Sequence, residues 1–266
     1  KKGFKIDFVN LDKNGQVDLE HLKQLINPNT TLVTIAAVDS EIGIRQPIEK
    51  IAKLLKSYEN VIFHTDITQC LGKDIIDLTN IDFASASGHK IYGFKGVGFI
   101  LKRENLKIIP LIHGGKSTTI YRGGTPATEL IASLNTSLNI LVPNIKNNYN
   151  YVQKLNAYLK QLLKNNNNIK INSTNKSLPH IVNISILNTD PLVIQKKLAD
   201  SNILISTQTA CSLNSNMSLA VLTITDDIKR AETSLRISLS YLTTRKEIKI
   251  FIKKLNFILG ELNESN

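Results

Sequence analysis

The chain has 266 residues, 42% of them hydrophobic, so it can bury the core of one large domain or two smaller ones. Two cysteines exclude a disulfide framework and no apolar stretch is long enough to span a bilayer, so we expect a soluble protein in a reducing compartment. The basic residues behind the net charge of +11 are scattered and not interleaved with aromatic side chains, so no nucleic acid is expected as main partner.

The first part of the chain alternates strand and helix patterns. A β-branched apolar run predicts a buried strand at residues 31–38, and further strands are predicted at 60–64, 82–86 and 97–101. Apolar residues recur at helical spacing over residues 48–55. Strands separated by helices need crossover connections, which predict an α/β fold with a mainly parallel sheet and helices on both faces.

Beyond residue 125 the pattern changes to long helical stretches, followed by a smaller α+β unit. Its strands are predicted at 181–187, 203–206 and 235–239, with a helix that begins at Pro191. These patterns predict a second, C-terminal domain with its own sheet.

We place the boundary between the two domains near Pro143, which gives residues 1–143 and 144–266. The last helix of the second domain begins with a capping box, Thr244 to Glu247, in which side chains satisfy free backbone donors. No internal repeat is evident, and the five histidines and two cysteines have no ligand-pair spacing, so no metal site is expected.

Two polar segments follow predicted strands, where ligands of parallel sheets usually bind. A lysine such as Lys90, placed at a strand end among small residues, can lose its proton and form a Schiff base with an aldehyde. Taken alone, Lys90 is more simply a surface lysine, and Asp66 could be a helix N-cap. As a pair, with Gln69 close by, they match the needs of a pyridoxal ring, whose nitrogen requires an acid beside it.

The chain resembles the cysteine desulfurases, which are fold-type-I pyridoxal-phosphate enzymes of the class-V aminotransferase family. The resemblance covers essentially the whole chain, with the motifs in the family's order. It rests on residues 63–78, 82–101, 111–115, 122–128, 206–212 and 234–240.

The resemblance implies pyridoxal 5'-phosphate as the cofactor and a homodimer with shared active sites. It makes residues 1–143 a partial cofactor-binding domain. It also assigns six residues to the cofactor: Lys90 through the Schiff base, Asp66 at the ring nitrogen, Gln69 at the ring oxygen, Ser87 and His89 at the phosphate, and Thr125 at the phosphate held by the other subunit.

The resemblance further implies that Cys211 accepts sulfur from L-cysteine as a persulfide, leaving L-alanine. Arg236 would bind the substrate carboxylate through its planar fork, and Ser40 would contact substrate where the family has asparagine. The polar residues around Cys211 predict a mobile, solvent-reachable loop in the small domain. Cys70 is expected in the core, on a helix beside the cofactor strand.

The sulfur would serve iron–sulfur cluster assembly or tRNA thio-modification, through a scaffold or another acceptor protein. We expect the protein to act in the cytoplasm, or in an organelle matrix if a targeting segment has been lost. The family's N-terminal phosphate loop and ring-stacking histidine have no counterpart in these residues. The alternatives are a relic or scaffold that binds sulfur-transfer partners, and a related lyase that acts on another amino acid.

Overall fold

The computed structural model describes residues 3–115, 119–207 and 217–264. The chain divides into two compact units, each with its own sheet. The parallel-sheet unit consists of Asn27–Ala37 and Ile48–Ile145. The C-terminal unit consists of Lys1–Ile26, Val38–Pro47 and Lys146–Asn266.

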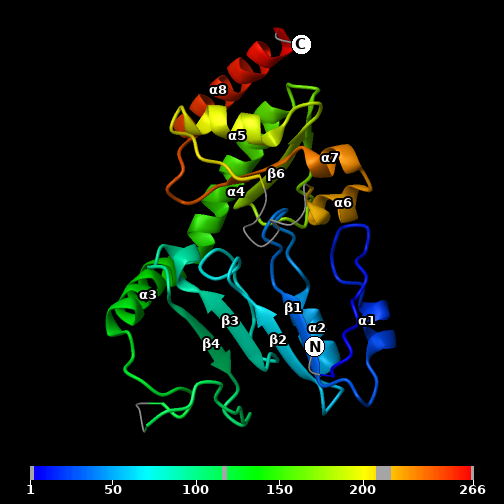
Figure 1. Ribbon diagram of the computed structural model, residues 1–266, viewed down its shortest axis with the longest axis vertical. Coiled ribbons are helices and arrows are strands. Elements are labelled where there is room, and N and C mark those ends of the chain that lie inside the picture. Colours follow the sequence, from blue (N-terminus) through cyan, green and yellow to red (C-terminus); the bar gives the residue numbers. More distant parts are fainter. Residues whose placement is uncertain (1–2, 116–118, 208–216, 265–266) are drawn as a thin grey trace. The chain divides into compact units, whose positions relative to one another are not determined.

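The parallel-sheet unit has four strands in the order β1-β2-β3-β4 (Figure 1). Their bounds are Leu32–Ala36 for β1, Ile62–Asp66 for β2, Phe83–Ser87 for β3 and Gly98–Lys102 for β4. β1, β2 and β3 are parallel, and β4 is antiparallel to β3. The sheet is therefore mainly parallel, as predicted, and the carboxyl ends of its first three strands share one edge.

Helices pack on this sheet through alternating buried positions. Phe63 and Ala84 are buried on one face, and α2 (Ile48–Leu55) buries its apolar side as its period predicted. α3 (Thr128–Leu141) contacts η1 (Gly88–Ile91), a 3₁₀ turn that follows β3 directly. A second 3₁₀ turn, η2 (Val142–Asn144), follows α3.

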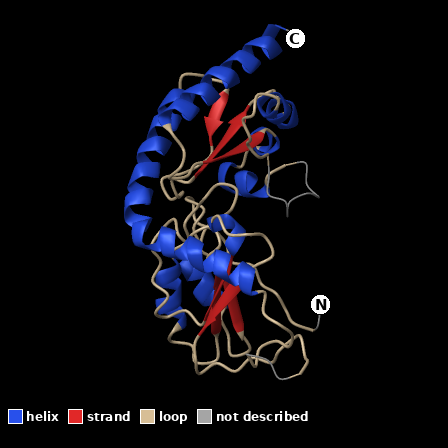
Figure 2. Ribbon diagram, turned by 90° about the vertical axis from the view of Figure 1, so that its left-hand side faces the viewer, coloured by secondary structure: helices blue, strands red, loops and turns tan. Residues whose placement is uncertain are grey.

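The C-terminal unit has a three-stranded antiparallel sheet in the order β5-β6-β7. The strands span Ile169–Ile171, Ile181–Ile186 and Ser234–Ser238. Its helices are α1 (Leu19–Leu25), α4 (Ile145–Leu163), α5 (Pro191–Ala199), α6 (Leu219–Thr225), α7 (Ile228–Glu232) and α8 (Arg245–Glu264). Figure 2 shows long helices along one side of these strands.

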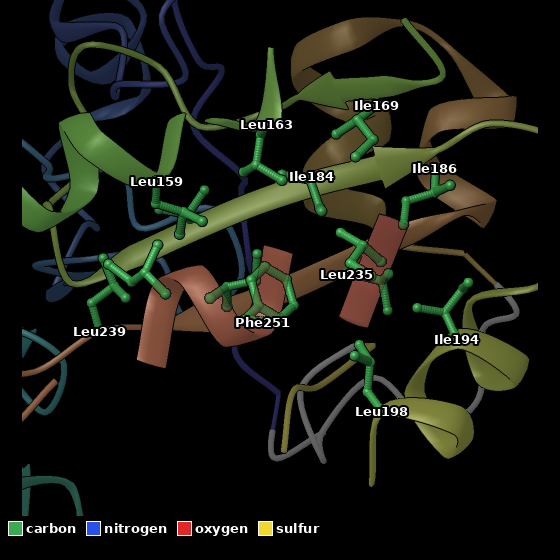
Figure 3. Close-up of a cluster of buried hydrophobic side chains, with 14 of the residues drawn as sticks. Leu159, Leu163, Ile169, Ile184, Ile186, Ile194, Leu198, Leu235, Leu239 and Phe251 are labelled. Atoms are coloured by element: carbon green, nitrogen blue, oxygen red, sulfur yellow. The ribbon is translucent and has the colours of Figure 1, made fainter. Parts of the chain in front are cut away.

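The core of the C-terminal unit joins α4, α5 and α8 to the sheet (Figure 3). Leu159 of α4, Ile184 of β6 and Leu198 of α5 are fully buried within it. Full burial of such a side chain contributes roughly 1.5–3 kcal/mol each. The apolar face predicted for the last helix supplies Phe251 and Leu255 to the same core.

Three details differ from the sequence-based expectations. Residues 203–206 are no strand, since only Ser206 makes an isolated bridge to Arg236. Cys70 is buried as expected, yet it lies in a run of turns and not on a helix. β5 was not predicted, because three residues are too short for a period to be read.

The segments Lys1–Ile26 and Val38–Pro47 belong to the C-terminal unit, although they precede residue 143. For Val38–Pro47 the physical reason lies in a second cluster, where Ile42 and Ile44 are buried against Val221 and Ala231. The C-terminal unit is therefore discontinuous in sequence. The functional assignment of the two domains stays a prediction.

No helix among the described residues combines the length and the apolar character needed to cross a lipid bilayer.

Candidate functional site

Asp66 and Ser87 lie at the carboxyl edge of the parallel sheet, and Thr68 links them. Asp66 is the last residue of β2, and one of its carboxylate oxygens accepts the backbone N–H of Thr68 at 2.8 Å. The Thr68 hydroxyl in turn accepts the backbone N–H of Ser87, the last residue of β3, at 3.2 Å. The edge therefore holds an exposed carboxylate and a half-buried serine in a fixed relation.

Lys90 and His89 belong to the η1 turn that leaves this edge. Lys90 is half-buried and His89 is exposed. Among the described residues, no carboxylate forms an ion pair with Lys90, so its amine is not committed to one. The turn ends at Tyr92 with a left-handed backbone, φ 66°. Gly93 follows, and a Cβ there would meet the carbonyl oxygen of Gly88 at 3.0 Å.

Gln69 lies three residues after Asp66, in the turn that follows β2. Its amide oxygen accepts a hydrogen bond from the amine of Lys73 at 3.1 Å. That bond orients the Gln69 side chain and leaves its amide N–H group as a donor toward a ligand oxygen.

His64 ties three strands together beside Asp66. Its Nδ1 lies 2.7 Å from the Thr34 hydroxyl on β1, and its Nε2 lies 3.0 Å from the Ser85 hydroxyl on β3. Burial lowers the pKa of the His64 ring, while the charge of Asp66 acts in the opposite direction. His64 therefore fixes the strands that carry Asp66 and Ser87. This role of His64 was not predicted from the sequence.

Thr125 is exposed in the segment before α3. Two glycines of the same region come close, since a Cβ on Gly123 would meet the Gly114 Cα at 2.9 Å. Only glycine fits such an approach of two backbones.

Arg236 and Ser40 lie in the C-terminal unit. A guanidinium N–H of Arg236 donates to the backbone oxygen of Ser40 at 2.9 Å. Burial lowers the pKa of Arg236, and the carboxylates of Glu41 and Asp39 oppose that shift. The Nε atom of Arg236 is buried and has no hydrogen-bond partner among the described residues. The guanidinium is thus a half-buried cation whose remaining terminal N–H groups are left for an anion.

Cys211, predicted as the sulfur acceptor, lies outside the described residues. The other predicted site residues divide between the two units. The parallel-sheet unit contains Asp66, Gln69, Ser87, His89, Lys90 and Thr125. Ser40 and Arg236 meet in the C-terminal unit. Among the described residues, no three histidine, cysteine or acidic side chains cluster in a way that could hold a metal ion.

The donor set of the parallel-sheet unit fits a pyridine ring that carries a phosphate and an aldehyde. An exposed carboxylate can pair with a ring nitrogen, a half-buried amine can react with the aldehyde, and serine and histidine donors can bind the phosphate. Only folding reveals the contributions of Thr68 and His64, because their partners lie on other strands.

Comparison with protein families gives a match to the aminotransferase class-V family over residues 1–251. The mitosomal cysteine desulfurase of Encephalitozoon cuniculi is 33% identical over 270 residues, which cover 99% of this chain and 62% of that protein. The cysteine desulfurase IscS of Buchnera aphidicola subsp. Baizongia pistaciae is 34% identical over 271 residues, covering 98% of this chain and 65% of that protein. The chain thus spans less than two thirds of the length of these relatives.

Solved structures of similar proteins have the same fold. A NifS-like protein matches with a TM-score of 0.89 and 32% identity, over 97% of this chain and 69% of that one. A NifS-like protein from Rickettsia africae matches with a TM-score of 0.84 and 31% identity, over 95% and 69% of the two chains. The chain is therefore similar to these proteins in its three-dimensional fold as well as in its sequence.

Proposed function

Because the chain belongs to the aminotransferase class-V family, we propose that the whole protein is a cysteine desulfurase. The observation that carries the proposal is the sheet edge where Lys90 and Asp66 lie, with Thr68 bridging to Ser87. The named relatives at about a third identity are cysteine desulfurases, which favours L-cysteine as the substrate.

Pyridoxal 5'-phosphate is the cofactor that these residues fit. When bound, it supplies an electron sink for negative charge that develops at the substrate's α-carbon. Asp66 would hold the protonated ring nitrogen, and Gln69 would donate to the ring oxygen. Ser87 and His89 would bind the phosphate. Lys90 would hold the cofactor covalently and then move a proton at the substrate's α-carbon, for which a half-buried amine is suited.

Arg236 would bind the substrate carboxylate, with Ser40 beside it. The supporting observation is the half-buried guanidinium, which keeps terminal N–H groups beyond the one that donates to Ser40. Bidentate binding to a carboxylate uses that donor capacity, and it is stronger in a partly buried site than in water.

Cys211 would take the sulfur. Its thiolate attacks the sulfur of L-cysteine, the carbon–sulfur bond breaks, and a proton replaces sulfur on the substrate carbon. The products are L-alanine and a Cys211 persulfide, so no external oxidant or reductant is consumed. The support for Cys211 is its polar sequence neighbourhood and its place in a motif of the family.

The persulfide sulfur would pass to an iron–sulfur scaffold or to an acceptor for tRNA thio-modification. The relatives include mitosomal and mitochondrial enzymes as well as bacterial IscS proteins. We therefore propose that the protein acts in the cytoplasm, as in bacteria, or in the matrix of an organelle. We also propose a homodimer in which Thr125 reaches the phosphate site of the other subunit.

The proposal is tested by mapping the cofactor on the full-length protein incubated with pyridoxal phosphate. Borohydride reduction should fix the cofactor to the peptide that contains Lys90, and Lys90→Ala should abolish that adduct. Lys56→Ala, which changes an exposed lysine on the same unit, is the matched control and should keep it. An adduct on another lysine, or none in the wild type, would contradict the assignment.

A further inference from the structure

The turn at residues 39–42 in the C-terminal unit is held by two side chains of one sheet. Asn183 of β6 and Arg236 of β7 are direct neighbours in the antiparallel register, so their side chains share a face. The Asn183 amide donates to the backbone oxygen of Glu41 at 3.1 Å, and Arg236 donates to that of Ser40 at 2.9 Å. The backbone carbonyls of Ser40 and Glu41 therefore both accept hydrogen bonds from one cross-strand pair of side chains.

The backbone of this turn is fixed from inside as well. The Asp39 carboxylate accepts the backbone N–H groups of Glu41 and Ile42 at 2.9 and 2.6 Å. Gly43 follows with φ 81°, and a Cβ there would meet the Cβ of Ile181 at 2.9 Å. This position requires glycine, so the turn has little freedom to adopt another shape.

The Glu41 side chain is buried and forms a hydrogen bond with a distant serine. Its exposed fraction is 6%, and its carboxylate accepts the Ser218 hydroxyl at 2.5 Å. The same hydroxyl accepts the backbone N–H of Val221 and so caps α6. A buried carboxylate is costly unless hydrogen bonds and a neighbouring cation compensate it. Ser218 supplies the hydrogen bond.

Arg236 is a cation whose charge Glu41 affects. The charge of Glu41 acts on the guanidinium together with that of Asp39, and both favour its charged form against burial. The backbone of Arg236 also pairs with Ser206, through bonds of 2.6 and 3.1 Å. Glu41 thus contacts α6 through Ser218 and balances the charge of the arginine that its own turn holds.

We propose that Glu41 is a positioning residue for Arg236. Its carboxylate locks the turn to the start of α6 and balances the guanidinium, so that the free donors of Arg236 keep one direction. The inference rests on the proposed function, in which Arg236 binds the carboxylate of an amino acid. Glu41 itself need not touch the substrate.

A matched pair of probes tests this in the full-length protein loaded with pyridoxal phosphate. L-alanine and ethylamine differ only in the carboxylate, and the binding of each is followed by absorbance. Glu41→Gln should weaken L-alanine binding about tenfold and ethylamine binding less than about twofold. In the Arg236→Ala background, Glu41→Gln should cause no further loss, because the two residues act through one contact.

Glu232→Gln, an exposed glutamate on α7, is the control and should leave both affinities unchanged. Equal weakening of the two probes by Glu41→Gln would mean general damage and would overturn the proposal. So would unchanged L-alanine binding.

A second measurement needs no cofactor. Hydrogen exchange of the Val221 and Arg236 amides should be at least about threefold faster in Glu41→Gln, with the Leu255 amide of α8 unchanged. Unchanged exchange at Val221 and Arg236 would contradict the role of Glu41. If the wild-type protein binds neither L-alanine nor ethylamine, the proposed function is wrong. The hydrogen-exchange measurement then decides by itself whether Glu41 holds Arg236 in place.

Discussion

Cys70 is a cysteine whose surroundings do not suit sulfur transfer. Its side chain is fully buried, and its thiol points to the backbone oxygen of Asp74 at 3.8 Å. A transferred sulfur must leave its site, so its carrier has to reach solvent or a partner protein. Burial also raises the free energy of a thiolate, which is the nucleophilic form. Cys70 therefore behaves as a small core side chain.

Cys211→Ser should abolish persulfide formation in cysteine-treated full-length protein, because a hydroxyl is a poor nucleophile toward sulfur. It should still bind pyridoxal phosphate and L-cysteine. Cys70→Ser should lower the free energy of unfolding by roughly 1–3 kcal/mol, through a buried hydroxyl, and leave turnover largely intact. Mass spectrometry locates the persulfide. A persulfide on the Cys70 peptide, with none on the Cys211 peptide, would reverse the two roles.

His64 makes the stability of the parallel-sheet unit depend on pH. Burial lowers the pKa of its ring in the folded state, although Asp66 opposes the shift. The unfolded chain then binds the proton more readily than the folded one. The stability that neutral His64 contributes is fully present above the ordinary histidine pKa and is lost as the pH falls through the lowered value.

The measurement is the urea midpoint of wild type and His64→Gln at about pH 7.5 and about pH 5.5. The wild type should lose more stability between the two pH values, because glutamine does not titrate. The carboxylates titrate in both proteins, so their effect cancels when the change in midpoint between the two pH values is compared for wild type and variant. An equal change in midpoint for the two proteins would show that His64 has the same pKa in the folded and unfolded states.

At the scale of elements, α8 shows how a local pattern fixes the start of a helix. The Thr244 hydroxyl accepts the backbone N–H of Glu247 at 3.2 Å, and the Glu247 carboxylate accepts the backbone N–H of Thr244 at 2.7 Å. The predicted capping box is thus confirmed. The side-chain and backbone hydrogen bonds from Thr244 lower the pKa of Glu247. The stability that the box contributes is present above the ordinary glutamate pKa and is lost as the pH falls through the lowered value.

Thr244→Ala should therefore lower the free energy of unfolding by about 1 kcal/mol near neutral pH. The difference from wild type should shrink in acid, where Glu247 is protonated. Thr223→Ala makes the same chemical change at an exposed position inside α6, where the hydroxyl donates only to the backbone oxygen of Leu219, and should cost little. Urea unfolding of the three proteins checks this. An equal loss in both variants would argue against the box.

The sequence predicts elements with a clear period and side-chain pairs that are local. All four strands of the parallel-sheet unit lie within two residues of their predicted bounds, and Asp66 and Lys90 were found from their places at strand ends. The contact between Glu41 and Ser218 could not be predicted, because 177 residues separate the two. Residues 203–206 have a strand-like composition, yet they make only one bridge, since propensity does not supply a neighbouring strand.

At the scale of the whole molecule, the region before α3 presents apolar side chains to solvent. Ile109, Leu111 and Ile120 have exposed fractions of 88%, 95% and 81%. Thr125, proposed to reach the other subunit, is exposed in the same region. Several strongly exposed apolar side chains in one segment favour an interface with a partner. This region is therefore where we expect a second copy to bind.

The full-length protein should be a two-fold dimer, in which each subunit completes the phosphate site of the other. Leu111→Glu should place an unpaired charge in the interface and shift the protein toward monomer, which light scattering measures. Cofactor retention should fall with it, because Thr125 of one subunit would no longer reach the other. Leu192→Glu, at an exposed leucine of α5, should leave the mass unchanged. A stable wild-type monomer with full cofactor occupancy would refute the shared site, since each phosphate would then be held within one chain.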